Sequence, residues 1–170
     1  QEGACFVQGM TDGEEIYVIE MGYRLDGDTM FIPYKQLINF DLIHYITDYL
    51  LQGKSDPKAL PSSQTEPFEK CACSYMLWTH SSGTLKNIYG LEDIAKMKNT
   101  SILRKAYPGD HVDQFRPVGN ILFVSDTCKE MCQTIDYINK TIKVLDQADN
   151  DILIRYTDFG TLLKNDERQY

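Results

Sequence analysis

The residues that most constrain the fold of this chain are 53–70, GKSDPKALPSSQTEPFEK, which hold three prolines and few apolar side chains. Proline fixes its own φ and has no backbone N–H to donate, so such a stretch interrupts regular structure. We therefore predict a linker over residues 55–70, between an N-terminal part, residues 1–54, and a small C-terminal α+β domain, residues 71–170. At 170 residues, the chain is long enough to bury a core.

The charge of the chain restricts its partners. It carries 17 Lys and Arg against 25 Asp and Glu, a net charge of −8, and has a pI near 4.8. Phosphate binding needs clustered positive charge, so neither nucleic acid nor an anionic membrane is an expected partner. We find no run of 18 apolar residues and no signal peptide, and we expect a cytoplasmic protein. Because Gln1 falls inside what reads as a strand, we expect a piece of a longer protein.

The five cysteines show no metal-binding pattern. No C-x-x-C pair occurs, and the three histidines do not repeat at ligand spacing with a cysteine. Cys71 and Cys73 have strand spacing, whereas Cys128 and Cys132 have helical i, i+4 spacing. We predict reduced and partly buried thiols.

The N-terminal part begins with a hairpin signal. Residues 3–9 and 15–21 alternate in polarity around the turn sequence Thr-Asp-Gly-Glu. A helix is predicted to follow within residues 39–54, with Asn39 as its N-cap and Gly53 at its end. Its apolar stripe consists of Leu42, Ile43, Ile46, Leu50 and Leu51.

The C-terminal part predicts a mixture of largely antiparallel strands and helices. We expect strands over residues 71–80, 83–90, 100–107 and 119–126, and a short helix over 91–98. Thr127 and Glu130 form a possible capping box, and apolar residues follow at helical spacing up to Ile142. Residues 151–156 read either as a last strand or as the start of a helix.

The length of the hairpin turn decides whether two candidate ligands share a face. A two-residue turn at residues 12–13 would send Glu20 to the face opposite Gln8. A three-residue turn at residues 12–14 would place Gln8 opposite Val18, with Glu20 as its diagonal neighbour on the same face. In that register an amide oxygen and a carboxylate could approach one Mg²⁺, a cation that prefers oxygen ligands. The alternative is that Glu20 is a solvated carboxylate at the edge of a sheet.

Two stretches of the sequence resemble a known enzyme family. FVQGMTDGEEIYVIEMGYRLDGD, residues 6–28, has a Gln followed twelve positions later by Glu, then an Arg and a glycine-containing loop. Further along, GTLKNIYGLEDI, YPGDHV and PVGNILFVSDTCKEMCQTIDYINKTIKVL follow in order. The first stretch resembles the end of the ATP-grasp catalytic lobe of biotin carboxylase and of the carbamoyl-phosphate synthetase large subunit. The others resemble the small β-rich region that follows that lobe in biotin-carboxylase-like ligases.

This resemblance implies an ATP-dependent ligase that joins a small-molecule carboxylate to an amine, or to a similar nucleophile, through an acyl phosphate. It implies ATP and Mg²⁺ as cofactors, with Gln8 and Glu20 as metal ligands. By the same resemblance, Arg24 faces the phosphoryl group or the substrate carboxylate, and Asp26, Gly27 and Asp28 form a substrate loop. An alternative for the two aspartates is plain turn formation.

The sequence departs from the family pattern at Gly22, where the family has an Asn that often contributes to a second Mg²⁺. The lobe that carries the phosphate-binding Lys and the glycine-rich flap precedes the matched part in the family. We therefore expect the 170-residue chain to need the rest of its own ATP-grasp protein and to be inactive alone. Two other hypotheses remain open: a non-catalytic α+β binding or interaction module, and a small hydrolase that pairs Glu20 with a histidine.

Overall fold

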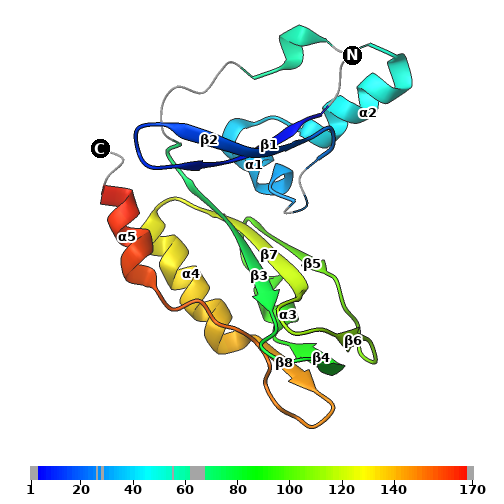
Figure 1. The fold of residues 1–170 in the computed structure, drawn as a ribbon, viewed down its shortest axis with the longest axis vertical. Coiled ribbons are helices and arrows are strands. Elements are labelled where there is room, and N and C mark those ends of the chain that lie inside the picture. Colours follow the sequence, from blue (N-terminus) through cyan, green and yellow to red (C-terminus); the bar gives the residue numbers. More distant parts are fainter. Residues whose placement is uncertain (1–3, 26, 28, 55, 62–67, 168–170) are drawn as a thin grey trace. The chain divides into compact units, whose positions relative to one another are not determined.

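Figure 1 shows the computed structural model, which describes residues 4–25, 27, 29–54, 56–61 and 68–167. The chain divides into two compact units, residues 1–64 and 65–170, called here the N-terminal and C-terminal units. The fold is α+β, with antiparallel sheets and few helices, as predicted.

The N-terminal unit opens with a two-stranded antiparallel hairpin, β1 (Phe6–Thr11) and β2 (Ile16–Gly22). Both predicted turn lengths were wrong, because pairing ends at Thr11 opposite Ile16 and leaves a four-residue turn. The Asp12 carboxylate sets this length by accepting the backbone N–H groups of Glu14 and Glu15, each at 3.0 Å. Hydrogen bonds from a side chain to its own turn offer the backbone an alternative to ladder pairing.

A β-bulge then changes the register inside the hairpin. Gly9 pairs with Val18, but the next pair is Gln8 with Glu20, so Ile19 is the extra residue of β2. Without this extra residue, the register set by the turn would leave Gln8 opposite Ile19 rather than Glu20.

Two helices follow the hairpin, α1 (Phe31–Ile38) and α2 (Leu42–Gln52), and a short 3-10 turn spans Pro57–Ala59. The sequence did not predict α1. Asn39 is not the N-cap of α2; it ends α1 in a left-handed conformation with φ 51°. Asp41 caps α2 instead, because its carboxylate accepts the backbone N–H of His44 at 3.0 Å. Gly53 ends α2 as predicted, with φ 69°.

The C-terminal unit contains two three-stranded sheets. Their strands run in the order β3-β7-β5 and β6-β4-β8. The bounds are β3 (Cys71–Trp78), β4 (Gly83–Tyr89), β5 (Thr100–Arg104), β6 (His111–Val112), β7 (Pro117–Ser125) and β8 (Lys143–Asp146). The predicted strands β3 and β4 therefore belong to different sheets.

Three helices complete this unit, α3 (Leu91–Ile94), α4 (Cys128–Thr141) and α5 (Phe159–Glu167). The capping box at α4 is present: Thr127 Oγ1 accepts the backbone N–H of Glu130 at 3.1 Å, and the Glu130 carboxylate accepts that of Asp126 at 3.2 Å. Residues 151–156 are extended, with isolated bridges at Asp151 and Leu153, and α5 starts only after them.

The core of the C-terminal unit lies around β7, which pairs with β3 on one side and β5 on the other. Eight of the nine residues of β7 are buried. The apolar stripe of α4 packs against this sheet with Met131, Ile135 and Ile138 buried, as the helical spacing predicts. Within the described ranges, no helix is long and apolar enough to span a membrane.

Candidate functional site

The hairpin of the N-terminal unit places Gln8 and Glu20 directly opposite each other. Directly paired residues of an antiparallel ladder lie on the same face, with Cβ atoms about 4.5–5.5 Å apart. Both side chains are exposed. The same-face arrangement that we considered therefore exists, although through the bulge rather than through a three-residue turn.

Arg24 lies on the same side of the hairpin as this pair. Phe6 pairs with Gly22 and lies two residues before Gln8, so strand alternation puts its ring on the face of Gln8 and Glu20. The Arg24 guanidinium stacks over the Phe6 ring at 4.4 Å from the centroid and donates to the Leu25 carbonyl at 2.9 Å. A cation over an aromatic face is held close to the ring by electrostatic attraction.

The packing of Phe6 explains why glycine stands at position 22. A Cβ added to Gly22 would lie 2.1 Å from Cε1 and 2.8 Å from Cδ1 of the Phe6 ring. A side chain at position 22 therefore cannot share this face with Phe6 in its present rotamer. Glycine at position 22 therefore makes room for the aromatic ring at position 6.

A cavity of about 420 Å³ adjoins this group of residues within the N-terminal unit. Phe6, Arg24, Phe31, Tyr34 and Leu42 contribute to its lining. Because α1 and α2 supply part of this lining, the helix missed by the sequence analysis helps to shape the surroundings of Arg24. Of the predicted substrate loop, Gly27 is described and has open space around it, whereas Asp26 and Asp28 lie outside the described residues.

The opposite face of the hairpin is entirely apolar apart from Gly9 and Thr11. Val7 pairs with Met21, and the next pairs on this face add Val18 and Ile16. These four side chains are 57, 69, 58 and 79% exposed, respectively. Among the described residues of the N-terminal unit, only Pro33 is buried. Contiguous exposed apolar side chains of this kind are often found at interaction surfaces.

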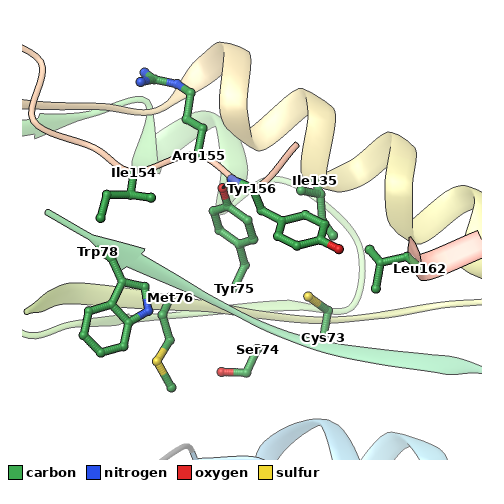
Figure 2. A pocket seen from close by; sticks show the side chains of 10 residues that line it. All are labelled: Cys73, Ser74, Tyr75, Met76, Trp78, Ile135, Ile154, Arg155, Tyr156 and Leu162. Atoms are coloured by element: carbon green, nitrogen blue, oxygen red, sulfur yellow. Dashed lines mark hydrogen bonds between the residues drawn. The ribbon is translucent and has the colours of Figure 1, made fainter. Parts of the chain in front are cut away.

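The C-terminal unit has its own cavity of about 450 Å³, shown in Figure 2. Tyr75 and Tyr156 line it with other apolar side chains, and the Tyr75 hydroxyl accepts the backbone N–H of Tyr156 at 3.1 Å. Burial raises the pKa of Tyr75, whose hydroxyl also donates to the side-chain carbonyl of Asn139. The sequence analysis selected no residue of this cavity, because its lining consists of ordinary strand and helix positions.

The charged residue at this cavity already has protein partners. Arg155 donates to the backbone carbonyls of Asn139, Ile142 and Leu153 and forms an ion pair with Asp151. Figure 2 shows its guanidinium directed away from the two tyrosines. Arg155 therefore anchors the extended segment before α5, and the cavity itself presents mainly aromatic and aliphatic surface.

No group of three or more His, Cys, Asp or Glu side chains within the described ranges is arranged to hold a metal ion. A Gln–Glu pair is a smaller donor set. It fits a hard divalent cation that takes its remaining ligands from water and phosphate, as Mg²⁺ does.

The fold formed by the hairpin, the helices after it and the small α+β unit matches part of several larger enzymes of known structure. Among solved structures, the L-amino acid ligase from Bacillus licheniformis matches with a TM-score of 0.70 and 18% identity, over 86% of this chain and 36% of its own. The phosphoribosylglycinamide synthetase from Anaerococcus prevotii matches with a TM-score of 0.67 and 20% identity, over 85% of this chain and 37% of its own.

A pyruvate carboxylase from Rhizobium etli matches over 94% of this chain and 16% of its own, with a TM-score of 0.59 and 14% identity. These are ATP-grasp enzymes, so the predicted fold is confirmed. The chain spans little more than a third of the length of the ligase and the synthetase. No family model and no curated protein matches the sequence.

Proposed function

We propose that this chain is the C-terminal part of an ATP-dependent ligase that joins a carboxylate to an amine, or to a similar nucleophile, through an acyl phosphate. The observation that carries the proposal is the direct cross-strand pairing of Gln8 with Glu20 beside Arg24, on a fold shared with ATP-grasp enzymes.

In this proposal Gln8 and Glu20 hold a Mg²⁺ ion through the amide oxygen and the carboxylate. When bound, Mg²⁺–ATP supplies the phosphoryl group and offsets its negative charge. Arg24 orients an oxyanion, either the phosphoryl group or the substrate carboxylate, because its planar guanidinium group can donate two parallel hydrogen bonds. The Phe6 ring, with its centroid 4.4 Å from the guanidinium carbon, helps to hold Arg24 beside the hairpin. The loop around Gly27 approaches the substrate.

The proposal also explains what covers the apolar face of the hairpin. Two strands with one apolar face do not make a stable sheet in water. We propose that further strands and helices of the same ligase cover Val7, Ile16, Val18 and Met21, while the opposite face, with Gln8 and Glu20, looks toward the nucleotide. The 170-residue chain then binds no ATP productively by itself.

The test is ADP release by the intact protein that contains this chain, with a panel of carboxylates and amines. Glu20→Ala is expected to lower turnover on the order of 100-fold or more, since loss of a metal ligand removes several kcal/mol of transition-state stabilisation. Gln8→Ala is expected to raise the Mg²⁺ concentration needed for half-maximal turnover.

Glu15→Ala is the matched control, because Glu15 is another exposed carboxylate of the same hairpin. It is expected to leave turnover unchanged. Full activity of Glu20→Ala would contradict the metal role. Absence of any ADP release with every substrate pair would instead favour the alternative, a non-catalytic α+β interaction module.

A further inference from the structure

Four of the five cysteines belong to β3 or α4. Cys71 and Cys73 are two residues apart on β3 and therefore point to the same face of the strand. Figure 2 shows Cys73 and Tyr75 on the α4 side of β3, with Ser74 and Met76 on the other side. Cys128 and Cys132 are one helical turn apart on α4. The two elements thus face each other with two thiols each.

The outer two of these thiols are in direct contact. Cys71 Sγ lies 2.6 Å from Cys128 Sγ, although the residues are 57 positions apart in the sequence. Each is the first residue of its element: Cys71 opens β3 opposite Ser125 of β7, and Cys128 opens α4 directly after its cap, Thr127. Their Sγ–Sγ separation is close to the length of a disulfide bond, about 2.05 Å.

The inner two thiols differ from the outer pair in different ways: Cys73 is partly exposed, as Cys71 and Cys128 are, but its pKa is raised, and Cys132 is buried. Cys132 is buried, with 8% of its surface exposed, whereas Cys71 and Cys128 are both partly exposed. Burial, together with the neighbouring Cys132, raises the pKa of Cys73 to about 12. Because the thiolate is the species that attacks a disulfide, Cys73 is a poor nucleophile at neutral pH.

We propose that Cys71 and Cys128 form an oxidisable dithiol site, which a low-molecular-weight disulfide converts to an intrachain disulfide. One of the two thiols loses its proton and attacks the reagent, forming a mixed disulfide and releasing the first reagent thiol. The other then attacks the mixed disulfide, giving the Cys71–Cys128 bond and the second reagent thiol. The protein loses two electrons and two protons, and the reagent disulfide is reduced to two thiols.

The bond would tie the start of β3 to the start of α4. It would close a long loop that contains β3 to β7, and cross-links over long loops restrict the unfolded chain most. The oxidised C-terminal unit is therefore expected to unfold at a higher denaturant concentration than the reduced unit. Such a site is compatible with the reduced state predicted from the sequence, because disulfides in reducing compartments form reversibly.

The experiment uses the 170-residue chain with Cys5→Ser, which removes the exposed fifth thiol. Native protein is incubated with oxidised glutathione, quenched with acid, and examined by intact-mass and peptide mass spectrometry. The expected product has lost the mass of two hydrogen atoms, gained no glutathione, and contains one cross-linked pair of peptides, Cys71 with Cys128. Its urea midpoint is higher and returns to the starting value after reduction.

Four variants in this background complete the test. Cys71→Ser and Cys128→Ser are each expected to stop at the glutathione mixed disulfide. Cys73→Ser and Cys132→Ser are expected to form the bond as the parent does. The proposal is overturned if the native parent keeps all four thiols, if it stops at a mixed disulfide, or if a different pair is joined. Cooperative urea unfolding of each variant before oxidation shows that the fold is intact.

Discussion

At the scale of single residues, the contact between Phe6 and Gly22 is the feature of the candidate site that leaves least room for a side chain. A side chain at position 22 would have to displace the Phe6 ring, and with it the surface on which Arg24 stacks. The glycine at position 22 therefore has a local steric reason. Gln8 and Glu20 lie exposed on the same face.

We expect Gly22→Ala to lower the melting temperature of the intact protein, because the added methyl group overpacks the face that Phe6 occupies; overpacking typically costs about 1–3 kcal/mol. Combining Gly22→Ala with Phe6→Ala is expected to be less damaging than the sum of the two single changes, since residues in contact do not behave additively. Differential scanning fluorimetry of the three variants measures this. Gly27→Ala is the control, because a Cβ there meets no neighbouring atom. Additive effects would show that the two residues are not coupled.

The pairing of Gln8 with Glu20 could be predicted only in part. Their spacing of twelve and the resemblance to ATP-grasp ligases pointed to one shared face. The register that produces this face could not be read from the sequence. The register depends on the hydrogen bonds to Asp12 and on the bulge at Ile19. Hairpin turns of different lengths have similar energies, so the sequence alone does not select one of them.

At the scale of elements, α4 is the helix most fully specified by its own sequence. Its cap, its capping-box partner and its buried stripe were all predictable, because each depends on residues within a few positions of one another. By contrast, α1 was missed. It contains Pro33 and its N-cap residue, Met30, makes no capping hydrogen bond through its side chain, so no local signal marks its start. Strand β8 was missed because Ile142 continues the helical spacing of α4.

Thr127→Ala is expected to destabilise the C-terminal unit by about 1 kcal/mol, since a backbone N–H at the start of α4 loses its acceptor. Urea unfolding followed by circular dichroism measures the difference. Gln133→Ala, an exposed position in the same helix, is the control and is expected to stay within about 0.5 kcal/mol of the parent. Equal stability of both variants would mean that the cap contributes nothing.

The turn after β8 makes the C-terminal unit sensitive to acid. Hydrogen bonds from the Asn150 side chain and from the backbone N–H groups of Asn150 and Ala148 lower the pKa of Asp146 below its usual value of 3.8. A carboxyl group whose pKa is lower in the folded state stabilises that state above the pKa of the unfolded chain. This contribution is lost as the pH falls below the usual pKa of 3.8 and through the lower folded-state pKa.

We therefore expect Asp146→Asn to flatten the pH dependence of the urea midpoint below about pH 5, because an uncharged side chain in the turn no longer titrates. Asp136→Asn is the comparison. Asp136 is half-exposed and forms an i, i+4 ion pair with Lys140, the kind of surface pair that contributes little. Identical acid profiles for the parent and Asp146→Asn would contradict the role given to this turn.

At the scale of the whole molecule, the two units differ in what they bury. Among the described residues, every member of the apolar core lies in the C-terminal unit. The helix α2 has no buried residue, and Leu50 and Leu51 of its predicted stripe are 73 and 80% exposed. Helical spacing thus predicted the helix correctly but could not say that its apolar side would lack a covering layer within this unit. The exact bounds predicted for the linker and for the domains stay predictions.

We expect residues 65–170 to unfold cooperatively when produced alone, and residues 1–64 to show no cooperative transition when produced alone. A hairpin and two helices that bury almost nothing do not offset the entropy of ordering the chain. Thermal melts followed by circular dichroism and the dispersion of amide NMR signals distinguish the two outcomes. A sharp transition in residues 1–64 would show that this unit needs no covering segments.

The place of β7 in its sheet has a consequence for how the chain matures on the ribosome. Both of its partners, β3 and β5, precede it in the sequence, yet neither pairs with the other. Until residue 125 leaves the exit tunnel, β3 and β5 have been synthesised, but β7, the strand that pairs with both, is missing. A C-terminal unit that ends before β7 is therefore expected to expose the unpaired backbone edges of β3 and β5.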